Sequence, residues 1–127
     1  MSIKYFFITF LFLFSVSSVA QVKDCSKFRT GTFKNNDDTI IVRNDSLQTE
    51  IHTKTNYRYI AVVKWLSDCQ YTLTFKEITD PIGNQMIGIT ITVDILSTSE
   101  DSYKYHAHND SFEVKGELTK TKNSYKL

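Results

Sequence analysis

The sequence of 127 residues predicts an all-β protein, a single eight-stranded antiparallel up-and-down β-barrel. Three observations lead to this fold class. Apolar and polar residues alternate with a period of two over many short segments, as in strands with one buried face. Turn-forming residues separate these segments at intervals of about 8–12 residues. No long stretch has the periodicity of an amphipathic helix.

The clearest alternation lies in residues 57–75, which also contain the only tryptophan of the chain. Tyr71 and Leu73 point to one face of an extended segment, whereas Thr72 and Thr74 point to the other. A second alternating segment precedes it, and a short polar connection joins the two. This pattern predicts a β-hairpin at the centre of the domain.

The whole series of alternating segments predicts strands over residues 28–34, 39–43, 47–54, 57–65, 69–77, 86–96, 103–108 and 111–120. Every connection is short, so consecutive strands are expected to pair in order and to close into a barrel without exposed edges. A β-sandwich is the alternative, but its Greek-key crossings need a long connection. An outer-membrane barrel is less favoured, because the loops show no alternation of long and short.

The first twenty residues have the features of a secretory signal peptide. Lys4 supplies the positive charge, residues 5–14 form the apolar stretch, and small residues lead to a cleavage site after Ala20. We therefore expect residues 1–20 to be a cleaved signal peptide and residues 21–127 to form the β-barrel domain. The protein is expected to be exported, to the periplasm or the extracellular space, with no membrane span in the mature chain.

The charge balance of the mature chain excludes some partners. Removal of Lys4 from 15 basic residues leaves 14, which equals the 14 acidic residues. A neutral chain without a Lys/Arg cluster is not expected to bind nucleic acid or an anionic membrane surface.

The chain contains two cysteines, Cys25 and Cys69. In an exported protein they predict one structural disulfide, with a buried free Cys69 as the alternative. The sequence contains no CxxC motif, so a catalytic thiol is not expected.

Three pieces of the chain, in this order, carry a resemblance to known proteins. Gly31-Thr32-Phe33 looks like the Gly-x-Trp opening of lipocalin-like barrels, with phenylalanine in the tryptophan position. Together with Cys25 and with residues 43–50 and 65–71, it resembles a group of small exported lipocalin-like (calycin-like) proteins of the Bacteroidota type that have no established activity. The resemblance implies a lipocalin-like barrel and supplies no active site.

Arg43, Gln48 and Glu50 are the first candidate binding residues. If a short loop follows Arg43, all three side chains project to the same face of two neighbouring strands. Facing inward, they would form a charge-assisted cluster that orients a polar head group inside an apolar cavity. Facing outward, they would form a solvated ion pair worth ~0–1 kcal/mol.

Tyr59, Trp65 and Tyr71 are the second candidate set. Aromatic rings with polar tips suit a cavity that binds a flat or amphipathic molecule. The alternative is that they fill the core of a small barrel.

The sequence predicts no catalytic residue, no cofactor and no metal site. His106, His108 and Glu113 would share a strand face and could hold a divalent ion, but lysines on the same face indicate a solvated surface. No nucleophile motif or phosphate-binding loop is present.

These observations favour an exported lipocalin-like binding protein for a small hydrophobic or amphipathic ligand. A protein-interaction or inhibitor module with a filled barrel is the alternative, and a metal-dependent enzyme is the third reading. A hollow interior would favour the ligand, and a packed interior would favour a protein partner.

Overall fold

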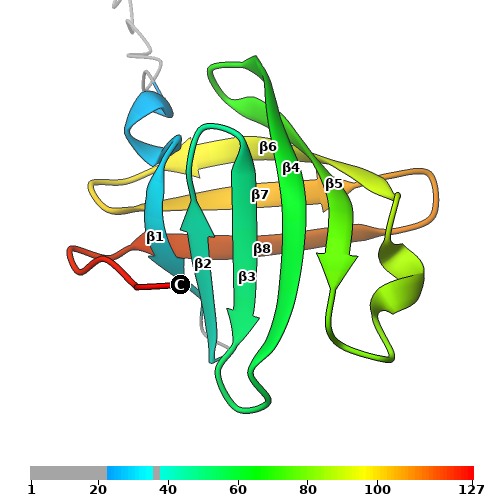
Figure 1. Cartoon of the computed structure of the whole chain (residues 1–127). Coiled ribbons are helices and arrows are strands. Elements are labelled where there is room, and N and C mark those ends of the chain that lie inside the picture. The colour runs from blue at the N-terminus through cyan, green and yellow to red at the C-terminus, as the bar shows by residue number, and fades with distance from the viewer. Residues whose placement is uncertain (1–22, 36–37) are drawn as a thin grey trace, which may run out of the picture.

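The computed structural model describes residues 23–35 and 38–127. In this part of the chain, eight antiparallel strands form a closed barrel in which β8 pairs with β1 (Figure 1). The strands are β1 (Gly31–Lys34), β2 (Thr39–Arg43), β3 (Leu47–His52), β4 (Tyr57–Ser67), β5 (Gln70–Ile78), β6 (Thr90–Thr98), β7 (Ser102–His108) and β8 (Glu113–Lys120). The predicted up-and-down barrel is therefore confirmed and the sandwich is excluded. The expected signal peptide, residues 1–20, lies outside the described residues.

The largest differences from the predicted strand boundaries are at the starts of β1 and β6, in each case because a short 3₁₀ helix replaces extended chain. The helix η1 (Ser26–Phe28) precedes β1, so this strand begins at Gly31 rather than at residue 28. The helix η2 (Asn84–Met86) precedes β6, and Gly88 then adopts a φ of 87°. This turn removes residues 86–89 from the predicted strand and leaves Ile87 and Ile89 exposed.

The apolar residues of the alternating strands point into the barrel interior. Buried side chains that form one cluster include Phe33, Ile41, Ala61, Val63, Leu73, Phe75, Ile91, Val93, Ile95 and Leu118. Full burial of each larger aliphatic or aromatic side chain stabilises the fold by roughly 1.5–3 kcal/mol. An apolar interior is the reverse of the polar interior of an outer-membrane barrel.

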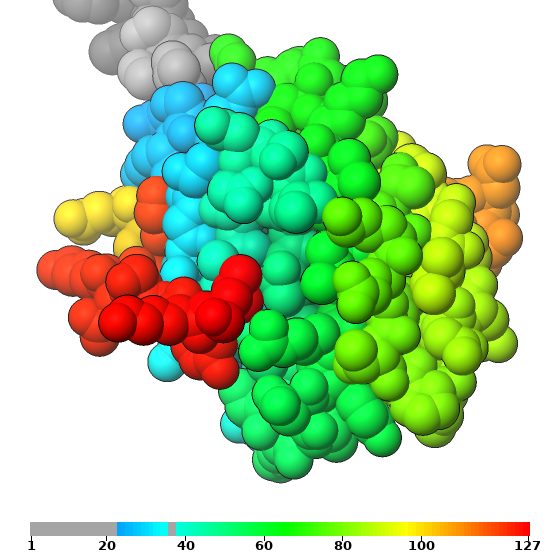
Figure 2. Space-filling model, viewed as in Figure 1, coloured from blue at the N-terminus to red at the C-terminus, as the bar shows by residue number. Residues whose placement is uncertain are grey.

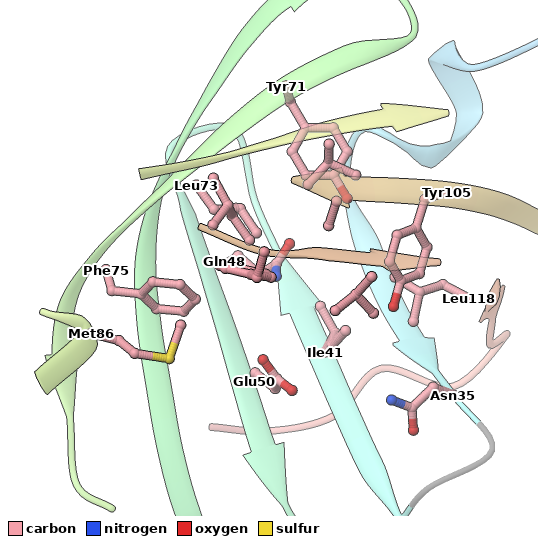
Figure 3. Close-up of a pocket in the computed structure, with 15 residues that line it drawn as sticks. Asn35, Ile41, Gln48, Glu50, Tyr71, Leu73, Phe75, Met86, Tyr105 and Leu118 are labelled. Carbon is pink, nitrogen blue, oxygen red and sulfur yellow. The ribbon is translucent and has the colours of Figure 1, made fainter. Parts of the chain in front are cut away.

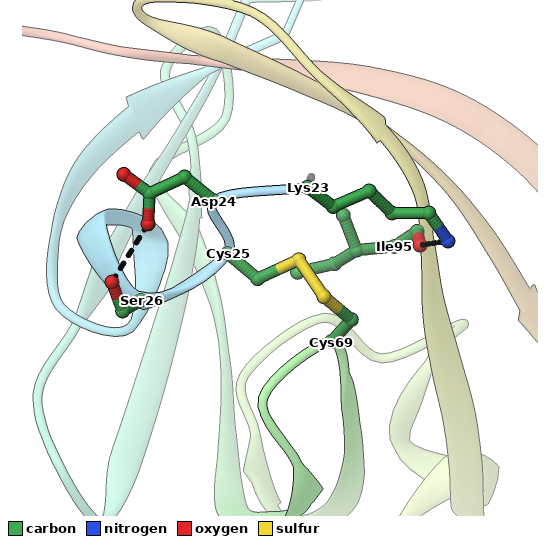
Figure 4. The surroundings of a disulfide bond; sticks show 6 residues. All are labelled: Lys23, Asp24, Cys25, Ser26, Cys69 and Ile95. Carbon is green, nitrogen blue, oxygen red and sulfur yellow. Dashed lines mark hydrogen bonds between the residues drawn. A yellow bond between two sulfur atoms is a disulfide. The ribbon is translucent and has the colours of Figure 1, made fainter. Parts of the chain in front are cut away.

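One end of the barrel is closed by η1 and by a disulfide (Figure 4). Cys25 and Cys69 are joined across 44 residues of sequence, which confirms the predicted disulfide. Cys25 is 1% exposed, and Lys23 Nζ donates a hydrogen bond to the carbonyl of Ile95 beside it. The disulfide therefore fixes the start of the described chain over the β4–β5 turn.

The contact between β1 and β8 completes the barrel through two residue pairs, Phe33 with Lys120 and Lys34 with Thr119. The segment after β8 continues this contact, because the amide of Thr121 donates to the carbonyl of Thr32. Figure 2 shows the C-terminal segment lying across the face made by β1 and β2. The last residues therefore cover part of the outer side of β1 and β2.

Gly31 is required where β1 passes beneath Lys120. Its φ of 135° is a conformation that L side chains rarely adopt. A Cβ atom there would lie 2.7 Å from Cε of Lys120, whose Nζ donates to the carbonyl of Lys27. The glycine of the Gly-x-aromatic opening therefore leaves room for the Lys120 side chain to reach the carbonyl of Lys27.

Candidate functional site

Arg43 lies at the centre of a buried polar layer near the closed end of the barrel. It is the last residue of β2, is 2% exposed and donates four hydrogen bonds to groups from four other segments. The acceptors are Gln48 Oε1 at 2.9 Å, the carbonyl of Phe28 at 2.8 Å, Tyr71 Oη at 2.9 Å and Tyr103 Oη at 2.8 Å. The two tyrosine hydroxyls are also hydrogen-bonded to each other, at 2.9 Å.

Aromatic rings surround the same guanidinium group. Its central carbon lies 4.7 Å from the ring centroid of Phe33, 4.6 Å from that of Tyr71 and 5.9 Å from that of Tyr103. Cation–π attraction of this kind strengthens when water is excluded. Burial opposes the charged form of Arg43, but its interactions with Tyr71 and Tyr103 outweigh burial and raise its pKa. Arg43 is therefore a buried cation held by neutral acceptors and ring faces.

A cavity of about 200 Å³ occupies the barrel interior next to this layer (Figure 3). Its lining residues are Asn35, Ile41, Gln48, Glu50, Tyr71, Leu73, Phe75, Met86, Ile91, Val93, Tyr105, Ala107, Phe112, Val114 and Leu118. Tyr71 and Gln48 form its floor, because both also contact Arg43. Phe112 and Val114 are 36% and 49% exposed, so the cavity meets solvent at the end of the barrel opposite the disulfide.

The polar lining residues of the cavity are Gln48 and Glu50 on β3, Asn35 after β1, Tyr71 on β5 and Tyr105 on β7. Gln48 and Glu50 alternate with Thr49, so both side chains face the interior. Gln48 Oε1 accepts from Arg43, which leaves its Nε2 as the amide atom that can donate to a bound molecule. Burial raises the pKa of Glu50, although His52 Nε2, 3.5 Å from its carboxylate, acts in the opposite direction.

The raised pKa of Glu50 predicts a pH-dependent effect of Glu50→Gln on stability. The folded state binds the Glu50 proton more tightly than the unfolded chain does, so this residue reduces stability as the pH rises through its folded pKa. We expect Glu50→Gln to be more stable than the wild type at about pH 8 and to lose that advantage at about pH 3.5. Thermal unfolding at both pH values measures the effect.

Glu77→Gln is the control for this prediction, because Glu77 is exposed on β5. A larger loss of stability in Glu50→Gln than in Glu77→Gln at the higher pH would show that the Glu50 carboxylate is stabilised by its surroundings rather than disfavoured by them.

The structure brings together only part of the two candidate sets. Arg43 and Gln48 face each other across the β2–β3 turn, and Glu50 faces the same interior further toward the open end. Arg43 is hydrogen-bonded to Gln48 but not to Glu50, and it does not line the cavity. Tyr71 belongs to both the polar layer and the cavity wall.

Tyr59 and Trp65 face the interior at opposite ends of the barrel, and neither lines the cavity. Tyr59 donates a hydrogen bond to Asp80 and packs against His52. The Trp65 ring contacts that of Tyr71 in a tilted arrangement, with centroids 4.6 Å apart, and lies under the guanidinium group of Arg29. Within the described part of the chain, Trp65 Nε1 is a buried donor with no hydrogen-bond partner.

Sequence reasoning missed several residues of the site. The Tyr103 hydroxyl and the carbonyl of Phe28 complete the polar layer, and Met86 and Phe112 line the cavity from connecting segments. Alternation in β7 indicates that Tyr103 faces inward, but it cannot indicate that Tyr103 contacts Arg43. Met86 and Phe112 fall within the predicted strands 86–96 and 111–120, but the structure places them in η2 and in the β7–β8 turn, so strand alternation does not indicate where their side chains lie.

The β7–β8 turn differs from the prediction of a two-residue loop. Its four residues are held by Asn109, whose side-chain Oδ1 accepts from the amides of Ser111 and Phe112. The longer turn places Glu113 opposite His108 rather than opposite His106. The Glu113 carboxylate nevertheless lies 3.0 Å from Nε2 of His106, diagonally across the strand pair.

Comparisons with known proteins were made at three levels. No protein-family model matches the chain. Searches of the curated proteins and of the solved structures found no match either. Among the described residues, no helix is long and apolar enough to span a membrane. The fold itself, an eight-stranded antiparallel barrel, is compatible with a lipocalin-like protein.

Proposed function

We propose that this protein is an exported, lipocalin-like binding protein for a small hydrophobic or amphipathic ligand, and that it is not an enzyme. The observation that supports this function is the cavity of about 200 Å³ inside the barrel, with a mostly apolar wall and a few polar side chains. Few precisely placed polar groups in an otherwise apolar concave site are typical of ligand pockets.

The size of the cavity limits the ligand. Pockets for drug-sized molecules usually measure ~300–1,000 Å³, and an apolar cavity of ~150 Å³ accommodates benzene. A cavity of about 200 Å³ therefore suits a molecule with one ring or a short alkyl chain. Long-chain lipids would have to extend past Phe112 into solvent.

The charge of the lining indicates the head group. Glu50 is the one acidic or basic side chain among the lining residues, since Arg43 lies beneath Tyr71 and Gln48. A neutral hydroxyl can hydrogen-bond to Glu50 or to Gln48, and an amine can pair with the Glu50 carboxylate. An anionic head group would face the same carboxylate without a cation in the cavity to balance it. We therefore propose a neutral or cationic amphipathic ligand.

Export is supported by the signal-peptide features of residues 1–20 and by the disulfide, which is typical of oxidising compartments. The resemblance to small exported proteins of the Bacteroidota type agrees with this location. The alternative function is a protein-interaction or inhibitor module, and a barrel with a filled interior would have favoured it. The cavity favours the ligand-binding function over this alternative.

Three small molecules of similar shape test the proposal: benzyl alcohol, benzylamine and benzoate. Each is titrated into the oxidised protein and followed by the amide chemical shifts of Leu73, Ile91 and Ala107, which line the cavity. Benzyl alcohol and benzylamine are expected to cause saturable shifts at these residues, with benzoate binding at least about tenfold more weakly, a difference of about 1.4 kcal/mol. Glu50→Gln is expected to weaken benzylamine selectively.

Ala107→Leu fills the cavity and is expected to abolish binding of the alcohol and the amine. Val62→Leu enlarges a side chain on the exposed face of β4 and is the matched control. If Ala107→Leu does not fold, Ile91→Phe fills the same space. Saturable binding that persists unchanged in a folded cavity-filled variant, or no binding by any of the three probes, would contradict the proposal.

A further inference from the structure

A cluster of metal-ligating side chains lies on the outer wall of the barrel, separate from the cavity. His106 and His108 alternate along β7, and Asp94 is on the neighbouring strand β6, opposite His106. One ligand atom from each of these three residues lies within 4.8 Å of the other two. All three side chains are partly accessible to solvent.

Neighbouring groups hold the cluster in place. Gln70 Nε2 donates to Asp94 Oδ1 at 2.7 Å, so the other oxygen, Oδ2, is directed to His108 Nε2, 2.7 Å away. The two imidazole rings stack with centroids 4.7 Å apart and planes inclined by 24°. The hydrogen bond from Gln70 orients the carboxylate, which reduces the rearrangement that this ligand needs to bind an ion.

We propose that Asp94, His106 and His108 bind a divalent transition-metal ion, with Zn²⁺ as the best match, on the outside of the barrel. Imidazole nitrogen and carboxylate oxygen are ligands that Zn²⁺ prefers, at ~2.0–2.2 Å. In a tetrahedral site such atoms are about 3.3 Å apart. The side chains therefore need to move by about 1.5 Å or less from their separation of at most 4.8 Å.

Metal binding replaces the present proton-mediated contacts. The hydrogen between His108 Nε2 and Asp94 Oδ2 passes to water or is replaced by one on Nδ1 of the neutral ring, and both atoms turn their lone pairs to the ion. The fourth position can be filled by water or by Glu113, whose carboxylate oxygen already lies 3.0 Å from His106 Nε2. Two lysines lie on the same face, Lys115 opposite His106 on β8 and Lys104 two residues before His106 on β7, but both side chains are exposed and can extend into solvent.

The test is isothermal titration of ZnCl₂ into tag-free, oxidised protein. We expect one Zn²⁺ per chain in the wild type and an accompanying rise in the thermal midpoint. His106→Gln and His108→Gln each remove one ligand and are expected to lower the affinity by about 100-fold or more, whereas Gln70→Leu removes an orienting partner and should lower it by about 10–100-fold.

His52→Gln is the matched control, because His52 is the third histidine of the chain and faces the carboxylate of Glu50 instead. Retained affinity in this variant supports the proposed site. The proposal is overturned if the wild type shows no saturable binding. It is also overturned if His106→Gln and His108→Gln bind Zn²⁺ as tightly as the wild type, or if His52→Gln alone removes binding. The cluster lies outside the barrel and the cavity lies inside it. The outcome of the zinc titration therefore does not bear on whether benzyl alcohol binds in the cavity.

Discussion

Arg43→Met is expected to lower the free energy of unfolding by about 3–5 kcal/mol. The substitution removes a buried cation that donates to Gln48, Phe28 and two tyrosines. Methionine fills much of the same volume but leaves those buried acceptors without their donor, and each unsatisfied group destabilises by about 1–3 kcal/mol. Urea unfolding followed by the fluorescence of Trp65, whose ring contacts that of Tyr71, measures the loss.

Lys64→Met is the control for this result, because Lys64 is exposed on β4 and a surface change of this kind is expected to stay within about 0.5 kcal/mol. Arg43→Lys retains the charge but not the planar fork of donors, so it should be less stable than the wild type and more stable than Arg43→Met. An Arg43→Met variant as stable as Lys64→Met would show that the buried layer contributes little to the fold.

Removal of the disulfide in the double variant Cys25→Ser/Cys69→Ser is expected to lower the free energy of unfolding by about 4 kcal/mol. The bond closes a loop of 44 residues, and in the entropic account it restricts the unfolded chain by roughly that amount. A net stability of roughly 5–15 kcal/mol is typical, so this loss is large. Urea unfolding with and without reductant, each sample equilibrated through the unfolded state, measures it.

Reductant should lower the stability of the wild type to that of the double variant and leave the double variant unchanged. Equilibration through the unfolded state matters, because Cys25 is 1% exposed and reductant reaches the folded disulfide slowly. If the wild type and the double variant differ equally with and without reductant, the stability difference arises from the serine substitutions and not from the disulfide.

The strands and their inward faces could be predicted from the sequence because alternation is a local signal. Tyr71 and Leu73 were expected on one face, and both are buried inside the barrel. The depth of a side chain along the barrel axis could not be predicted in this way. Depth depends on the tilt and stagger of the strands, which no single segment encodes. For this reason Tyr59 and Trp65, although they face inward, lie at opposite ends and away from the cavity.

The candidate site shows the same division between local and distant information. The short loop after Arg43 predicts that Arg43 and Gln48 share a face, and they are hydrogen-bonded. The exclusion of Arg43 from the cavity depends on Phe28 and Tyr103, which are 15 and 60 residues away in sequence. The pairing of His108 with Asp94 depends likewise on which strand lies next to β7 and on its register.

The closure of β8 onto β1 has a consequence for the order of folding. Each of the other strand pairings joins neighbours in sequence, whereas the pairing of Phe33 with Lys120 must close a loop of nearly the whole domain for only two residue pairs. Closing such a long loop costs conformational entropy, and this cost arises before the two residue pairs have formed to compensate for it. We therefore expect the β1–β8 contact to be absent from the folding transition state, so that a substitution that weakens only this contact accelerates unfolding while the folding rate stays nearly constant.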